Sequence, residues 1–345
     1  MKHNNMNMNR TDINVLVTGA SGMVGSHLID LLIEKSNWNV YGLIRWGSSL
    51  DNLENALQID SKQRLHFCYG DIRDSHAMDR VVKEVKPDYT FHLAAQSFPK
   101  TSFDSPDDTL ITNINGTLNL LESIKNFSKK CITHVCSSSE VFGRVSRDKL
   151  PIDEECSFHP ASPYAISKVG TDLLGRFYAE AYGMNVQVTR MFTHTGPRRG
   201  DVFAESSFAK QIAMAEVGLI PPVINVGNLN SLRTIADVRD AVEAYHMLLT
   251  INPIPGNYFN IGGSKVMTIG EILEYLKSKS LIKNLRHEED ESRLRPIDAD
   301  LQIPSTDKFK SHTGWEPKIS YEVTLSDLLN YWRDQVKKNK VIINR

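Results

Sequence analysis

A tyrosine and a lysine one helical turn apart are the residues of this chain best suited to acid–base chemistry. They are Tyr164 and Lys168 of the segment YAISK. Side chains at this spacing share one face of a helix. We expect the lysine ammonium to lower the pKa of the tyrosine, so that a tyrosinate can take a proton from a hydroxyl near neutral pH. The pair predicts a proton-transfer site.

A second polar group, SSSE at 137–140, follows the apolar run Ile132–Cys136. Ser138 contributes a hydroxyl group to this segment. Glu140 distinguishes between the reactions that this site could perform, because oxidation or epimerisation at one carbon needs no second acidic residue. A dehydration does need one, since oxidation at one carbon makes the neighbouring C–H acidic and a carboxylate can remove that proton. The alternative is that Glu140 only caps a turn or a helix.

A glycine-rich turn lies far upstream, between the apolar run Asn14–Thr18 and the amphipathic stretch Ser26–Lys35. Glycines there permit a tight turn and a close approach of backbone to phosphate, and the helix N-terminus offers unpaired N–H groups. The order of strand, turn and helix predicts a dinucleotide site, whereas the alternative is an ordinary tight turn. The turn residues are Gly19, Ala20, Ser21, Gly22, Met23, Val24 and Gly25.

The GxxGxxG spacing of this turn resembles the short-chain dehydrogenase/reductase superfamily, and the long C-terminal addition resembles its extended branch. In that superfamily an Asp after the third strand lies against the adenine, and the backbone after the fourth strand passes along the cofactor. The resemblance therefore implies further cofactor contacts at Asp71, Ile72, Leu93, Ala94, Ala95, Gln96 and Ser97.

The end of the second predicted strand indicates which cofactor is used. An acidic residue there would bind the ribose 2′-hydroxyl and repel a 2′-phosphate. Here the strand ends in Arg45 and Trp46, with no acid. Arg45 can pair with a 2′-phosphate and Trp46 can cover the adenine, which favours NADP over NAD. NAD stays the alternative, because an exposed arginine is often only a solvated charge.

The elements that must position these residues alternate between strand and helix, which is the pattern of βαβ units. We predict an α/β fold: a Rossmann-type doubly wound parallel sheet with a smaller, mostly C-terminal substrate-binding region. The cofactor domain is placed at 12–192 with sheet contributions from about 234–261, the substrate region mainly at 193–335, and a disordered leader at 1–11. The predicted strands are 14–18, 40–44, 65–69, 89–93, 132–136 and 186–192, and the predicted helices are 26–35, 74–86, 115–126 and 164–182.

Composition excludes several classes of partner. A net charge of −1 without basic clusters argues against nucleic acid or an anionic membrane surface. No apolar run reaches the roughly 18 residues of a spanning helix. The four cysteines show neither CxxC spacing nor clustered histidines, so we expect reduced thiols, a cytoplasmic location and no metal ion.

With these motifs in place, the chain resembles the GDP-mannose 4,6-dehydratase family over almost its whole length. The resemblance rests on LAAQS at 93–97, SFDSP at 102–106, SSSEVFG at 137–143, SPYAISK at 162–168, GPRRGDVF at 196–203, VGNLNSLR at 226–233, LRP at 294–296 and TGWEPKI at 313–319.

The resemblance implies roles for individual residues. Ser138, Glu140 and Tyr164 match the family's catalytic Thr (or Ser), Glu and Tyr, with Lys168 beside them. His194 and Arg199 match cofactor contacts. Arg233 and Arg295 match arginines on the nucleotide diphosphate and ribose, for which a planar guanidinium is well suited. Further substrate contacts are expected at Ser138, Ser139, Thr193 and Lys210.

Three positions depart from the family pattern. Thr193 replaces the usual Asn of an FNH element, which puts one substrate contact in doubt. Asp108 stands where a cofactor-contacting Tyr is typical. Trp46 replaces a second arginine that also helps the family's tetramer form, so a homodimer and a homotetramer both stay open.

The implied reaction converts a GDP-manno-configured sugar, either GDP-mannose or GDP-manno-heptose, to its 4-keto-6-deoxy form. NADP would be tightly bound and recycled. The rivals are a GDP-4-keto-6-deoxy-sugar reductase, a 4-epimerase or C4-dehydrogenase, and a non-catalytic nucleotide-sugar sensor. The complete Ser138, Tyr164 and Lys168 set argues against a sensor, which has no need of a tuned base.

Overall fold

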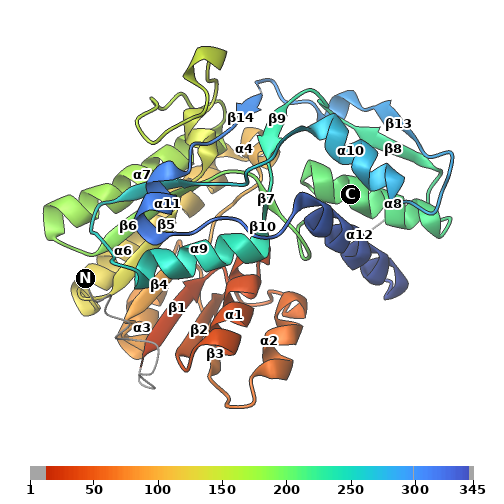
Figure 1. The fold of residues 1–345 in the computed structure, drawn as a ribbon. Helices are drawn as coiled ribbons and strands as arrows, with labels where there is room; N and C mark the ends of the chain where they lie inside the picture. The colour runs from red at the N-terminus through yellow and green to blue at the C-terminus, as the bar shows by residue number, and fades with distance from the viewer. Residues whose placement is uncertain (1–12, 298, 342–345) are drawn as a thin grey trace.

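The computed structural model describes residues 13–297 and 299–341, and its centre is a seven-stranded parallel sheet (Figure 1). The strand order is β11-β6-β5-β4-β1-β2-β3. The chain adds β2 and β3 on one side of β1 and then β4, β5, β6 and β11 on the other side, as in a doubly wound fold. The strands are β1 (Asn14–Thr18), β2 (Asn39–Ile44), β3 (Leu65–Tyr69), β4 (Tyr89–His92), β5 (Ile132–Cys136), β6 (Val186–Met191) and β11 (Tyr258–Ile261).

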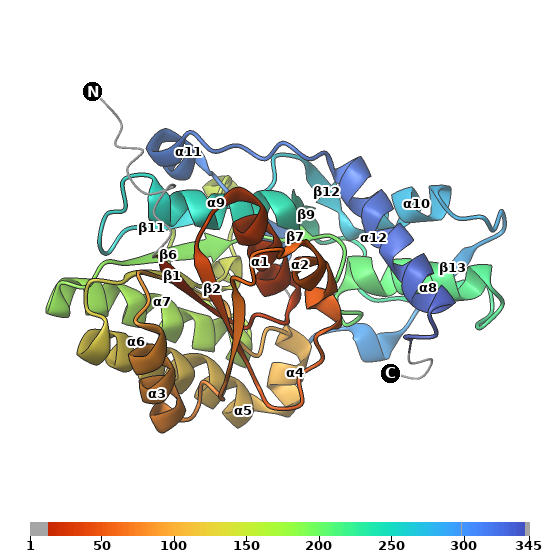
Figure 2. The ribbon, with the colours of Figure 1, turned by 90° about the horizontal axis from the view of Figure 1, so that it is seen from below.

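Both faces of the sheet are buried, which explains the nearly unbroken apolar runs of its strands. Along β1, Val15 and Val17 enter the core on the α1 side, whereas Leu16 enters the core on the α3 and α6 side. Figures 1 and 2 show the helices on both sides of the sheet. They are α1 (Met23–Lys35), α2 (Glu54–Ile59), α3 (Ser75–Val85), α4 (Pro99–Asp104), α5 (Pro106–Leu110), α6 (Gly116–Phe127), α7 (Pro163–Tyr182), α9 (Val238–Thr250) and α11 (Asp307–Thr313).

A second core lies beside the parallel sheet, at the right in Figure 1, where α8, α10 and α12 pack together. Its helices are α8 (Ala204–Glu216), α10 (Ile269–Ser278) and α12 (Tyr321–Lys337). The short strands of this half are β7 (His194–Thr195), β8 (Val223–Val226), β9 (Leu232–Thr234), β10 (Ala236–Asp237), β12 (Val266–Thr268), β13 (Arg286–Glu289) and β14 (Leu301–Gln302). They pair as β10-β7, β12-β9-β14 and β13-β8.

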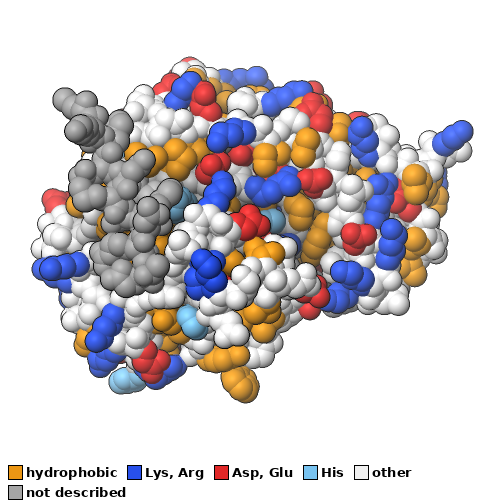
Figure 3. All heavy atoms as spheres, turned by 60° about the horizontal axis from the view of Figure 1, so that its bottom comes forward, with side chains coloured by type: hydrophobic (Ala, Val, Ile, Leu, Met, Phe, Trp, Pro, Cys, Tyr) orange, Lys and Arg blue, Asp and Glu red, His pale blue; other side chains and the backbone are white. Residues whose placement is uncertain are grey.

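The predicted fold class is confirmed, because the described chain has a parallel Rossmann-type sheet covered by helices. The predicted strand 132–136 has the observed bounds, and the predicted helix 164–182 begins one residue earlier at Pro163. The predicted leader 1–11 lies outside the described residues. Across the parts described, no helix has the length and apolar character needed to span a bilayer. The face in Figure 3 carries interspersed acidic and basic side chains.

Candidate active site

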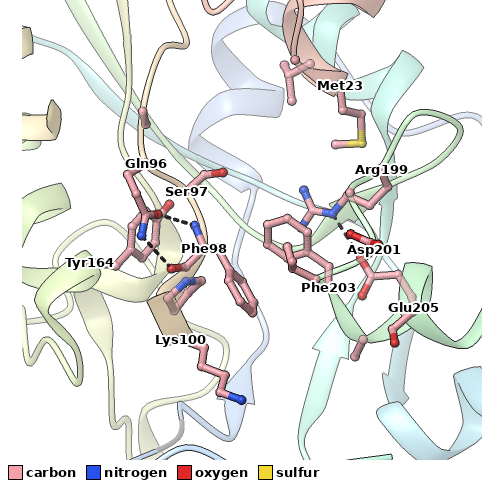
Figure 4. A pocket seen from close by; sticks show the side chains of 18 of the residues that line it. Met23, Gln96, Ser97, Phe98, Lys100, Tyr164, Arg199, Asp201, Phe203 and Glu205 are labelled. Atoms are coloured by element: carbon pink, nitrogen blue, oxygen red, sulfur yellow. Dashed lines mark hydrogen bonds and ion pairs between the residues drawn. The ribbon is translucent and has the colours of Figure 1, made fainter. Parts of the chain in front are cut away.

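One cavity of about 1530 Å³ runs between the parallel sheet and the C-terminal half of the chain. Figure 4 shows Phe98 and Lys100 on one side of it and Arg199 and Phe203 on the other. Almost every predicted site residue lines this cavity. These are Gly19, Ser21, Gly22, Met23, Val24, Gly25, Arg45, Asp71, Ile72, Leu93, Ala94, Ala95, Gln96, Ser97, Ser138, Ser139, Glu140, Tyr164, Lys168, Thr193, His194, Arg199, Lys210, Arg233 and Arg295.

Ala20 is the exception. Its side chain is fully buried in the core on the α1 side, and its backbone N–H donates to Leu43 O at 3.4 Å. Ala20 therefore supports the turn from beneath and is not part of the cavity wall.

The glycine turn forms a cradle that side chains would fill. Gly19 has a φ of +70°, and a Cβ on Gly25 would lie 2.2 Å from Gly19 O. Helix α1 begins after Gly22 without a side chain capping its first N–H groups. Asn52 holds the turn through a 2.9 Å hydrogen bond from Nδ2 to Ser21 O. A close backbone and an uncapped helix start fit a pyrophosphate.

Arg45 and Trp46 lie at the far end of this cradle. Trp46 is 85% exposed and its ring meets Tyr69 edge-on at 5.1 Å between centroids. Arg45 lines both the main cavity and a smaller hollow that it shares with Trp46 and Tyr69. A guanidinium beside exposed aromatic rings suits the adenine end of a dinucleotide that carries a 2′-phosphate.

Asp71 and Asp108 are both held by Arg73. Arg73 donates to Asp71 through Nε at 3.0 Å and through Nη2 at 2.7 Å, and to Asp108 through Nη1 at 3.0 Å. The hydrogen bonds from Arg73 keep the pKa of Asp71 below its usual range. The departure at Asp108 thus has a structural role, because it completes an ion-pair cluster with the acid at the end of β3.

Helix α7 and the segment after β5 bring the catalytic candidates together. Tyr164 and Lys168 stand in the first turns of α7, whose N-cap Ser162 accepts a hydrogen bond from Ala165 N at 3.0 Å. Ser138 follows β5 and hydrogen-bonds Tyr164. Lys168 Nζ donates to Cys136 O at 2.8 Å and lies 5.9 Å from the centre of the Tyr164 ring. Lys168 therefore ties the catalytic helix to the end of β5.

The predicted lowering of the tyrosine pKa by Lys168 is wrong. Burial raises the pKa of Tyr164 well above its ordinary value, although the Ser138 hydrogen bond and Arg199 oppose this shift. Burial also lowers the pKa of Lys168. Desolvation disfavours the charged form of each group, and this effect dominates here.

Glu140 lies in the single helical turn Ser139–Phe142, directly after Ser138. Its backbone N–H donates to Ser138 Oγ at 3.2 Å, and its side chain is 17% exposed within the cavity. The Glu140 carboxylate is 3.8 Å from Arg295 Nη1. Arg295, expected only on the nucleotide, is thus also an ion-pair partner of Glu140. Capping of the turn is done by Ser138, so Glu140 is left to face the cavity.

His194 and Arg199 face the catalytic group from the other side. The Arg199 guanidinium lies 3.4 Å above the centre of the Phe203 ring and 3.5 Å from the buried Glu205 carboxylate. Burial, aided by Arg199, lowers the pKa of His194 to about 4, so its ring is neutral at pH 7. Its Nδ1 donates to Phe192 O at 3.1 Å.

The remaining substrate candidates lie on the C-terminal side of the cavity. Lys210 Nζ pairs with Asp201 Oδ2 at 2.8 Å, and Arg233 Nη1 donates to Ala299 O at 2.6 Å. Thr193 lines the cavity, and its carbonyl oxygen accepts from Ala236 N at 3.0 Å. The cavity wall therefore offers several cations to a diphosphate.

Sequence reasoning missed two residues that join the parts of the site. Asn113 is buried in the wide turn Ile111–Asn115, and its Nδ2 donates to Gln96 O at 2.9 Å and to Ser167 Oγ at 2.8 Å. It thereby connects the cofactor loop to α7. Lys100 donates to the carbonyl of Ser292 and so bridges the two halves of the cavity. Neither residue belongs to a chemical motif, although the basic Lys100 stands close to the LAAQS segment.

Comparison with known proteins adds to this geometry. The model of the family described as GDP-mannose 4,6 dehydratase matches residues 16–328. The chain belongs to this family. GDP-mannose 4,6 dehydratase 1 of Arabidopsis thaliana is 31% identical over 337 residues, which cover 95% of this chain and 91% of the relative.

A second kind of relative carries a different name. GDP-6-deoxy-D-mannose reductase of Pseudomonas aeruginosa is 33% identical over 252 residues, covering 73% of this chain and 82% of the reductase. The solved structure of RMD from Pseudomonas aeruginosa complexed with NADPH has a TM-score of 0.78 and 28% identity, covering 93% of this chain and 99% of that one. The predicted membership of the dehydratase family is thus confirmed, and a reductase shares its fold.

Proposed function

We propose that this protein is a 4,6-dehydratase acting on a GDP-manno-configured sugar, either GDP-mannose or GDP-manno-heptose. The product is the GDP-4-keto-6-deoxy sugar. The observation that carries the proposal is Glu140. Its carboxylate lies in the same cavity as Ser138 and Tyr164 and on the turn that immediately follows Ser138.

Each catalytic residue has a separate task. Ser138 orients the C4 hydroxyl and Tyr164 accepts its proton, since the two are hydrogen-bonded to each other. Glu140 then removes the proton from C5, which the C4 ketone has made acidic, and donates a proton as the C6 hydroxyl leaves as water. A proton returns to C5 at the end of the cycle. Lys168 fixes α7 against β5 and so keeps Tyr164 in place.

The cavity fits NADP. The cradle at Gly19 and Gly25 leaves no room for side chains, and the uncapped start of α1 faces it. Arg45 would hold the 2′-phosphate, and the backbone of 93–97 would run beside the rest of the cofactor. A bound NADP supplies reversible hydride storage between C4 and C6, so no net redox equivalent is consumed.

A reductase is the second candidate, favoured by the relative from Pseudomonas aeruginosa. Purified protein incubated with GDP-mannose or GDP-manno-heptose separates the two activities. A dehydratase yields a product lighter by one water without consuming NADPH. A reductase leaves both sugars unchanged and consumes NADPH in proportion to product when it is given a 4-keto-6-deoxy sugar.

A homo-oligomer is part of the proposal. Helix α7 exposes a stripe of apolar side chains, Ile166, Leu173 and Phe177, each about half exposed at 51%, 49% and 51%. Leu118 on the neighbouring helix α6 is 38% exposed. Such a stripe fits a dimer made by packing α6 and α7 on their copies. The four cysteines are free thiols, which supports a cytoplasmic location.

A further inference from the structure

The strand pair β8 and β13 forms one wall of the cavity in the C-terminal half. In its parallel register, Val223 pairs with Arg286, Ile224 with His287, Asn225 with Glu288 and Val226 with Glu289. Paired residues of a parallel ladder point to the same face, and successive residues alternate.

The two faces of this pair are different. Ile224 and Val226 are buried in the second core, so their partners His287 and Glu289 belong to that face. Val223, Asn225 and Glu288 line the cavity. The register therefore turns Glu288 into the cavity, and turns the adjacent Glu289 away from it.

The surroundings of Glu288 and Asn225 suit a flat aromatic ring. Val223 of β8, Ile220 and Pro221 just before this strand, and Met214 of the adjoining helix α8 add apolar side chains to the cavity lining. Figure 1 shows α8 beside β8, and the two are locked together by Gln211. Its side chain accepts from Asn225 N at 2.8 Å and donates to Asn225 O at 3.2 Å. Gln211 thus fixes the backbone of β8 against α8 at Asn225.

The polar groups of this wall are available to a ligand. Among residues 13–297 and 299–341, no cation lies within ion-pair distance of the Glu288 carboxylate, and no hydrogen bond is made by the Asn225 side chain. An ionised carboxylate only accepts hydrogen bonds, whereas an amide can also donate them. The two side chains stand next to each other across one strand pair, about 4.8 Å apart at the backbone.

We propose that Glu288, with Asn225 beside it, reads the nucleobase of the substrate as guanine. The proposal rests on the function proposed above and identifies the residues that choose its nucleotide. Guanine alone presents two adjacent donors, N1–H and the 2-amino group, followed by the O6 acceptor. The carboxylate accepts from both donors and the Asn225 amide donates to O6. Adenine places a donor next to an acceptor, and uracil places one donor between two acceptors, so neither matches.

The test compares GDP with inosine diphosphate, which lacks only the 2-amino group. Binding is measured by calorimetry on the full chain loaded with NADP. We expect wild-type protein to bind GDP roughly tenfold to a hundredfold more tightly than inosine diphosphate. Inosine diphosphate can make only one of the two hydrogen bonds that guanine donates to the carboxylate. Glu288→Gln should weaken GDP binding by a similar factor and bring the two affinities within about threefold of each other.

Glu289→Gln is the matched control, since it makes the same change of charge one residue along, on the other face. We expect it to leave both affinities unchanged. If the Glu288→Gln variant binds GDP as tightly as the wild-type protein and prefers GDP over inosine diphosphate by the same factor, the assignment of Glu288 is wrong. The dehydratase proposal would remain intact. Wild-type protein that binds UDP or ADP more tightly than GDP would instead overturn the proposed GDP-sugar substrate itself.

Discussion

Replacing Glu140 by glutamine tests the dehydration step directly. Glutamine keeps the size of the side chain and part of its hydrogen bonding, but it cannot accept a proton from C5. The oxidation at C4 depends on Ser138, Tyr164 and Lys168, none of which is altered. We therefore expect the variant to stop at a 4-keto sugar that retains its C6 oxygen.

The structure indicates how large the two effects of this change should be. Glu140 loses an ion pair with Arg295 whose members are 17% and 25% exposed at a distance of 3.8 Å. A partly solvated pair of this length contributes at most about 1 kcal/mol to stability. Loss of a general base lowers the rate by about 10²–10⁴, or roughly 3–5 kcal/mol in activation free energy. Water loss should thus fall steeply while the melting temperature barely moves.

The assay follows product mass and the entry of solvent deuterium at C5 in heavy water. Glu34→Gln serves as the control, because Glu34 is exposed on α1 and does not line the cavity. The control should release water and exchange C5 at the wild-type rate. If Glu140→Gln releases water as fast as the control, Glu140 is not the C5 base, and the observation that carries the dehydratase proposal is lost.

Three further changes test other parts of the site. Tyr164→Phe should preserve NADP binding and lower turnover by about 10²-fold or more. Burial raises the pKa of Tyr164 and only its ionised form is a base, so the turnover of the wild-type protein should keep rising between about pH 6 and pH 9. A turnover that is constant from neutral pH upward would contradict this. Arg45→Ala should weaken NADP roughly tenfold or more while leaving NAD nearly unchanged, and equal weakening in calorimetry would show that Arg45 does not bind the 2′-phosphate. Gly25→Ala places a methyl group 2.2 Å from Gly19 O, so thermal unfolding should show a loss of about 1–3 kcal/mol, and an unchanged melting temperature would contradict the tight cradle.

The parts of the molecule that were predictable are those whose signal is local in the sequence. Strand β5 and helix α7 carry continuous periodic patterns, and α7 has Ser162 and Gly183 at its ends. The glycine turn and the YAISK segment likewise depend on short fixed spacings. The parallel sheet followed from the alternation of such elements, because parallel strands need crossover helices.

Other features depend on residues that are distant in the chain. From the sequence, Asp108 is only a departure from a cofactor-contacting Tyr. Its ion pair with Arg73, which lies on another segment, depends on the fold. The pKa of Tyr164 is raised by its burial, which the one-turn spacing to Lys168 does not reveal. Glu288 stands in a charged run, and only pairing with β8 distinguishes its face from that of Glu289.

The residues proposed to choose the substrate differ from those proposed to perform the chemistry in how the fold holds them. Ser138, Tyr164 and Lys168 are fixed by β5 and α7, two elements of the buried sheet, and their geometry is common to oxidation, epimerisation and reduction alike. By contrast, Phe98 and Phe203, whose rings meet across the cavity at 5.6 Å, and Lys100, which donates to the carbonyl of Ser292, narrow the cavity. These contacts join two halves of the chain through loops. A heptose carries one carbon more than mannose, beyond C6. We therefore expect the choice between mannose and manno-heptose to depend on the space that these contacts leave in the cavity, rather than on the catalytic group.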